Sequence, residues 1–167
     1  SLDLGAEDYN RLEQRGIDLW NGRQGAQRWQ IFRYHNRGHS TLVVNDAEQA
    51  VASSAAIPEF STDPGNAFAV VDLSATYAGQ LARTTRRFQL LPDRSICIED
   101  RLLGGTQPAT VRWGMVTDAG LKTNGTGRAW LEKNGKRLRF EISSPANLSL
   151  KSWPAHGSLA EPQARQP

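Results

Sequence analysis

The stretch RAWLEKNGKRLRFEIS, residues 128–143, carries the strongest local structural signal in the chain. Asn134 and Gly135 separate two runs in which apolar and charged residues alternate. Asn-Gly favours a tight hairpin turn, because both central residues of a type I′ turn need a positive φ. We expect one apolar face of this hairpin to be formed by Trp130, Leu138, Phe140 and Ile142. We expect the charged side chains to alternate with this face or to point outward; they are Lys136, Arg137, Arg139 and Glu141.

Short strand-like segments recur through most of the chain. Polar turns containing Asp, Gly or Pro separate them, and we expect strands at residues 28–34, 40–46, 67–77, 80–91, 94–103 and 109–116. Residues 6–20 are the one segment with room for a helical turn, and Gly16 weakens it. About eight strands with almost no helix indicate an all-β fold, an antiparallel two-sheet β-sandwich of jelly-roll-like type with little helix.

The domain organisation follows from where the alternation stops. We assign residues 1–145 to the β-sandwich domain. Residues 146–167 lose the strand pattern and are rich in Pro, Ser, Ala and Gln, so we expect an irregular C-terminal tail or a truncated extension.

The composition fits one folded domain and argues against several classes of partner. The chain has 167 residues, a formal net charge of +3 and a pI near 9.3, and its arginines are spread along the sequence. A mildly basic chain suits an anionic partner, but the sequence has no zinc finger, RNP-like motif or basic helix, so we expect no nucleic acid. No segment approaches the ~18 apolar residues of a spanning helix, so we expect no membrane contact. Cys97 cannot form an intramolecular disulfide, and we expect it to be buried in a strand.

The stretch RYHNRGHSTLVVND, residues 33–46, is the first candidate for a functional site. His35 and His39 are four residues apart on a turn that enters a strand, an arrangement open to a metal site or to two solvated histidines bonded to the backbone. Nearby arginines supply forked donors that match carboxylate or sulfate, and two aromatic rings supply flat faces for a sugar. The alternative is that the arginines form the outer face of a half-buried strand. These side chains are Arg28, Arg33, Arg37, Trp29 and Tyr34.

Three longer segments carry a resemblance to a known family. They are DLGAEDYNRLEQRGIDLW, RWQIFRYHNRGHSTLVVNDAEQ and AVVDLSATYAGQLARTTRRFQLLPDRSICIEDRL, and together with the last hairpin they cover roughly residues 4–143. The shared features are an acidic-Gly-x-x-x-Tyr lead-in, an Arg-Trp pair, a Gly-His-(Ser/Asn)-Thr-Leu core with a later Gln, and an Asp-x-x-x-x-Tyr segment followed by Arg-Arg and Asp-Arg. In this order they resemble the β-sandwich domain of the heparinase II/III-like polysaccharide lyases.

The resemblance implies a lyase of two parts, an N-terminal α-helical toroid and this C-terminal sandwich, with an acidic polysaccharide bound between them. Such enzymes cleave uronic-acid-containing polysaccharides by β-elimination, in which the proton at C5 can leave once the neighbouring carboxylate is neutralised. The resemblance places the catalytic tyrosine on the toroid, so we expect this domain to be inactive alone and to contain no catalytic residue. It also implies a bacterial protein that is periplasmic or secreted.

The resemblance further implies a divalent metal, often zinc, in the sandwich. His39 stands at the position that resembles the metal ligand, and Asp72 resembles the carboxylate ligand. Arg37 occupies a place where relatives often have a second histidine, and Val116 the place of a third. Because His39 and Asp72 alone would bind zinc weakly, we expect an unoccupied or structural remnant.

The expected substrate contacts are one wall of the cleft: Arg37, Arg33, Tyr34, Trp29 and His35. Arg37 is the first choice, because a guanidinium can clamp a uronate carboxylate or a sulfate through two hydrogen bonds. Two alternatives from another class stay open, a non-catalytic carbohydrate-binding sandwich and a structural sandwich whose apolar face docks another domain. Heparin-like glycosaminoglycans, alginate and bacterial exopolysaccharides all fit a few arginines equally well.

Overall fold

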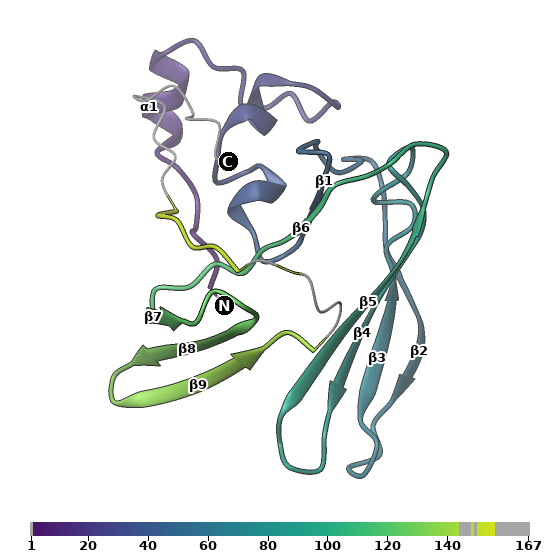
Figure 1. Cartoon of the computed structure of the whole chain (residues 1–167). Helices are drawn as coiled ribbons and strands as arrows, with labels where there is room; N and C mark the ends of the chain where they lie inside the picture. The colour runs from purple at the N-terminus through teal and green to yellow at the C-terminus, as the bar shows by residue number, and fades with distance from the viewer. Residues whose placement is uncertain (1, 144–147, 149, 156–167) are drawn as a thin grey trace.

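The computed structural model describes residues 2–143, 148 and 150–155, and within them most of the regular secondary structure is antiparallel strand (Figure 1). The first four strands are β1 (Leu42–Val44), β2 (Ala56–Ser61), β3 (Phe68–Asp72) and β4 (Leu81–Leu90). The later strands are β5 (Ile96–Gly104), β6 (Val111–Trp113), β7 (Gly120–Thr123), β8 (Arg128–Lys133) and β9 (Lys136–Glu141). The helical segments are α1 (Tyr9–Gln14) and the 3-10 turns η1 (Gln27–Gln30) and η2 (Asn36–Gly38). The predicted all-β sandwich with little helix is confirmed.

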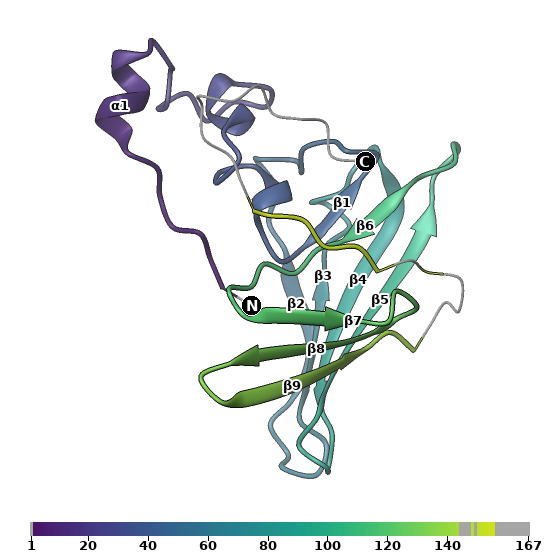
Figure 2. The same cartoon turned by 60° about the vertical axis from the view of Figure 1, so that its left-hand side comes forward.

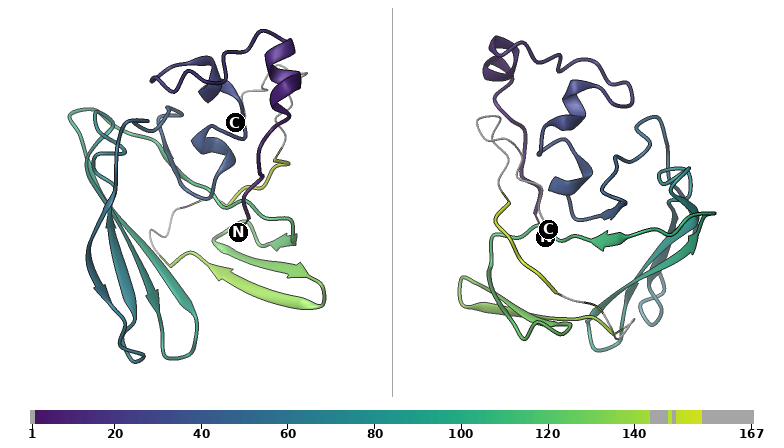
Figure 3. Two further views of the ribbon diagram at one scale, coloured as in Figure 1. Left: turned by 180° about the vertical axis from the view of Figure 1, so that it is seen from behind. Right: turned by 45° about the horizontal axis from the view of Figure 1, so that its top comes forward.

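Hydrogen bonding divides the strands into three groups. The largest sheet has the order β2-β3-β4-β5, the smaller one has the order β7-β8-β9, and β1 pairs with β6. Figures 1 and 3 show the β1–β6 pair between the other two sheets, and Figure 2 shows β7–β9 passing in front of the long strands. The strands of the two larger groups therefore belong to separate layers joined through β6.

Two small cores hold the fold together. Leu42, Val44, Tyr77 and Leu81 form the first, next to the β1–β6 pair. Leu12, Leu19 and Ile31 form the second, which fixes α1 to the residues around η1. The second core lies under the candidate site, so its packing decides how that part of the chain is arranged.

The predicted strand over residues 28–34 is wrong. This segment forms η1 and a following turn, in which Ile31 and Tyr34 pack three residues apart against the second core. A spacing of three fits a 3-10 or helical turn, whereas a strand would place these two side chains on opposite faces. The chain between α1 and β1 therefore folds as compact turns.

The sequence does not predict two of the strands, β2 and β7, whereas the helical turn for which residues 6–20 have room does form. β2 contains Pro58 and pairs only with β3, as expected of an edge strand, and its register shifts between Ala56 and Glu59. β7 is short and contains only Leu121 as a large apolar residue. α1 begins after Asp8, whose carboxylate accepts a hydrogen bond from the Arg11 N–H at 3.2 Å.

Two expectations about single residues are wrong as well. Cys97 lies in β5 as expected, but it is exposed, because β5 is an edge strand and this side chain points outward beside Gln89. Trp130 does not share the apolar face of the hairpin. It pairs with Arg139, while Leu131 pairs with Leu138 on the opposite face.

The Asn-Gly turn is confirmed: φ is 51° at Asn134 and 72° at Gly135, and Lys133 pairs with Lys136. The boundary between the sandwich domain and the tail, at residues 145 and 146, stays a prediction, since residues 144–147 and most of the expected tail lie outside the described residues. Within the described part of the chain, no helix is long and apolar enough to cross a membrane.

Candidate functional site

Four of the residues predicted from sequence come together around one pocket. Trp29, Arg33, Tyr34 and His39 line it, although they come from η1, the turn after it and the end of η2. The other lining residues are Arg28 and three residues of the lead-in segment, Asp3, Gly5 and Ala6. These side chains come together because residues 28–34 form compact turns and not the predicted strand.

Arg33 fastens the lead-in segment, residues 2–7, to the pocket. Its Nε lies 3.1 Å from Oε1 of Glu7, and its Nη1 donates to the carbonyl oxygens of Leu4 and Ala6. The Glu7 N–H donates to the Tyr34 hydroxyl at 3.1 Å. Arg33 thus already binds a carboxylate, the acceptor that a uronic acid would offer, together with two backbone carbonyl groups.

His39 is engaged at both ring nitrogens. Nε2 donates to the carbonyl oxygen of Arg33 at 3.0 Å, and Nδ1 lies 3.2 Å from Oδ2 of Asp3. Gly38, just before it, explains the Gly-His pair: a Cβ there would overlap the carbonyl oxygen of Phe32. The glycine lets the chain fold back tightly and aims His39 at the lead-in.

Arg28, which the sequence offers as a forked donor but which is not among the expected substrate contacts, is the second arginine of the pocket. Its guanidinium carbon lies 5.0 Å from the ring centroid of Tyr34 and 5.3 Å from that of Trp29, and its Nη1 donates to the Leu19 carbonyl at 2.9 Å. Contacts of this kind are cation–π interactions. Burial raises the pKa of the Tyr34 hydroxyl, so Tyr34 remains a neutral phenol at physiological pH. The pocket therefore combines cations with aromatic faces.

Arg37 and His35 lie away from this pocket. Arg37 Nε forms an ion pair with Oδ1 of Asp46 at 2.8 Å, and its Nη2 donates to the Asp46 carbonyl at 2.7 Å. His35 is buried, and its Nδ1 accepts the Arg37 N–H at 3.1 Å. Burial, together with the positive charge of Arg37, lowers the pKa of His35 to about 4. His35 is therefore a neutral histidine that caps η2.

The two residues that resemble metal ligands do not form a zinc site between them. Asp72 ends β3 and its Oδ1 accepts the Ser74 N–H at 2.9 Å, and hydrogen bonds from Ser74 hold its pKa below the usual range. Asp72 does not line the pocket of His39, whose nitrogens are both occupied. No group of three His, Cys, Asp or Glu side chains suited to a metal occurs among the described residues. These donors do not form a zinc site. The expectation of an unoccupied or structural remnant stays a prediction.

The remaining motif residues have a structural role. The Tyr77 hydroxyl is fully buried and donates to the Leu42 carbonyl at 2.9 Å. It also accepts from Gln49 Nε2 at 2.7 Å, and Thr41 Oγ1 lies 3.2 Å away. The Thr-Leu, Gln and Tyr of the motifs thus form one buried network that holds β1 in place.

The lead-in is the part of the site that sequence reasoning missed. Its acidic residues are visible in DLGAEDY, but nothing in their spacing relates Asp3 and Glu7 to residues thirty positions later.

A family model described as "Heparinase II/III-like, C-terminal" matches residues 2–166. No curated protein matches the chain.

Proposed function

Because this chain belongs to the heparinase II/III-like C-terminal family, we propose that it is the part of a polysaccharide lyase that forms one wall of the substrate cleft. The substrate is a polysaccharide that contains uronic acid, and the reaction is β-elimination. The wall consists of Trp29, Arg33, Tyr34 and His39. The expectation that Arg37 also contacts substrate stays a prediction, to be tested with Arg37→Ala.

One observation carries the proposal: Arg33 and His39 of the pocket hold carboxylates of the chain itself. Arg33 contacts Glu7 at 3.1 Å and His39 contacts Asp3 at 3.2 Å. β-Elimination needs a neutralised uronate, because the charge that develops when the C5 proton leaves is delocalised into the carboxylate as an enolate. A guanidinium supplies this stabilisation through two parallel hydrogen bonds. Arg33 is therefore the residue we assign to the uronate carboxylate.

The base is expected on the toroid of the full-length protein. The described tyrosines are poor candidates, since Tyr77 is fully buried and the Tyr34 hydroxyl already accepts the Glu7 N–H. Tyr9 lies edge-on to Trp20 at 5.7 Å. In this proposal the domain binds and orients the polysaccharide and does not turn it over alone.

The test uses the full-length protein and the absorbance of the unsaturated uronate product. We expect Arg33→Gln to lower kcat/KM by about 100-fold, the loss of a charge-assisted pair worth roughly 1.5–3 kcal/mol. Arg101→Gln removes an equal charge from the exposed side of β5 and is the control. Since Glu7 occupies the same guanidinium, Glu7→Gln should lower KM. Equal kcat/KM in wild type and Arg33→Gln would exclude Arg33 from the cleft.

A second candidate function, docking of another domain, is favoured by an apolar surface on the four-stranded sheet. Register places Phe60, Ala69, Phe88 and Ile98 in one row across the strands. The exposed fraction is 69% for Phe60 and 42% for Ile98, and Ile96 in the neighbouring row is 70% exposed. A surface of this kind marks an interaction site in most soluble proteins.

We propose the α-helical toroid of the same protein as the occupant of this surface. The chain alone should then bind a hydrophobic dye and self-associate as its concentration rises, and Phe60→Ser should reduce both. A monomeric chain that binds no dye would exclude this role.

A further inference from the structure

The outward face of the β7–β9 sheet has an aromatic residue flanked by cations. Lys122 of β7 pairs with Trp130 of β8, and Trp130 pairs with Arg139 of β9, so the three side chains form one row across the sheet. Ala129 and Leu131, on either side of Trp130 in the strand, are buried on the opposite face. Trp130 itself is partly exposed. We call this row and the charged residues beside it the platform.

The charges of the platform do not balance. Glu132 is shared by Lys122 and Arg137, at 2.9 and 2.7 Å. Glu141 is shared in the same way by Arg128 and Arg139. Four cations thus meet two carboxylates, and the excess of two positive charges is most of the formal +3 of the chain.

The cations also lie farther out than the carboxylates. The side chains of Lys122, Arg137 and Arg139 are 72, 65 and 67% exposed, whereas those of Glu132 and Glu141 are 32 and 34% exposed. The less exposed carboxylates therefore bind the more exposed cations, so a molecule that approaches the sheet contacts positive charge first. Ordering of this kind reduces the entropy lost when the side chains bind an anion.

We propose that the platform binds acidic polysaccharide at a second site, apart from the pocket of Arg33 and His39. Trp130 offers its indole ring to the apolar face of a sugar, and the cations on either side bind carboxylate or sulfate groups of the neighbouring residues of the polymer. Nucleic acid would need several stacking rings along a strand, and the platform offers one. The platform shares no residue with that pocket. It therefore holds the polymer without taking part in the reaction.

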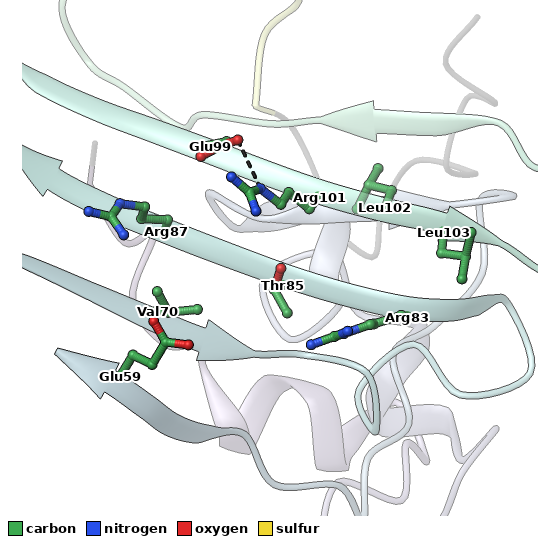
Figure 4. A pocket seen from close by; sticks show the side chains of 9 residues that line it. All are labelled: Glu59, Val70, Arg83, Thr85, Arg87, Glu99, Arg101, Leu102 and Leu103. Carbon is green, nitrogen blue, oxygen red and sulfur yellow. Dashed lines mark hydrogen bonds and ion pairs between the residues drawn. The ribbon is translucent and has the colours of Figure 1, made fainter.

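The outer face of the four-stranded sheet provides the comparison. Figure 4 shows Arg83, Arg87 and Arg101 there, with the Arg101–Glu99 ion pair at 3.0 Å and Glu59 on β2. Asp72 points to the same side, since it pairs with Thr85. Three arginines thus face three carboxylates, and no tryptophan lies among them. Arg83→Gln with Arg101→Gln is accordingly a matched two-charge control.

The test is isothermal titration of this chain with heparin, which is sulfated, and with oligogalacturonate, which carries carboxylates alone. We expect Lys122→Gln with Arg139→Gln to weaken binding of at least one of them about tenfold or more at low salt, and the control pair less than about twofold. Trp130→Ala should weaken binding as well, with urea unfolding used to show that the variant is folded. The probe that binds more tightly identifies sulfate or carboxylate as the anion.

An equal loss of affinity in the platform double variant and the control double variant would overturn the proposal. No binding of either probe, or tighter binding of a single-stranded oligonucleotide, would overturn it as well. The proposal shares with the proposed function only the class of polymer. Product formation by the full-length protein tests the cleft, and titration of this chain tests the platform, so failure of one is distinguishable from failure of the other.

Discussion

Tyr77→Phe removes a hydroxyl that the fold cannot replace with water. The ring is fully buried, its hydroxyl donates to the Leu42 carbonyl at 2.9 Å, and it accepts from Gln49 at 2.7 Å. After the substitution the Leu42 carbonyl loses this bond, whereas the Gln49 amide keeps only Thr41 Oγ1 at 3.3 Å. The three neutral hydrogen bonds lost, to Leu42, Gln49 and Thr41, together cost about 2–4 kcal/mol.

Urea unfolding followed by tryptophan fluorescence measures this difference directly. We expect a lower midpoint with an unchanged m value, because the substitution leaves the surface exposed on unfolding almost the same. Tyr34→Phe is the matched control, since its partly exposed hydroxyl accepts one N–H bond that water can replace, and it should cost less than about 1 kcal/mol. If Tyr77→Phe cost no more than Tyr34→Phe, the buried network would not stabilise β1 as argued.

Three further substitutions test other parts of the fold. His35 is neutral in the folded state with a pKa of about 4, while the unfolded chain takes up a proton below about pH 6.5, so stability should fall by up to about 3 kcal/mol as pH drops through this window. His35→Asn, which keeps the cap, should flatten the dependence in urea titrations at several pH values, and an unchanged slope would contradict the assignment. Gly135→Ala should cost about 1 kcal/mol in the same assay, because φ is 72° and no atom crowds the site, whereas Gly104→Ala should cost less. Gly38→Ala should cost about 2 kcal/mol or more because its Cβ meets the Phe32 carbonyl, and a stable variant would refute the close approach.

The hairpin shows both what local sequence determines and where it misleads. Asn134-Gly135 specified the turn correctly, because its two positive φ angles are a local property. Trp130 was nevertheless placed on the wrong face. Because Lys133 pairs with Lys136 across the two-residue turn, each even-numbered residue of β8 pairs with an odd-numbered residue of β9, so Trp130 pairs with Arg139 and not with Leu138. The register was available from the turn, and it reveals the platform.

The candidate site was only partly accessible from sequence, because its members meet through tertiary contacts. The sequence predicts Trp29, Arg33 and Tyr34 on one strand, whereas they lie on η1 and the turn after it and line one pocket with His39. Their convergence depends on a small core whose packing overrides the apparent alternation. The lead-in contacts join residues about thirty positions apart, and no local pattern encodes them.

Turnover of a uronic-acid polysaccharide by the full-length protein tests the central claim most directly. The measurement compares formation of unsaturated uronate by wild type, Arg33→Gln and Arg101→Gln, with this chain alone as a further sample. We expect activity in wild type and Arg101→Gln, a loss of about 100-fold in Arg33→Gln, and no product from the chain alone. Product formation by the chain alone, or full activity in Arg33→Gln, would contradict the central claim.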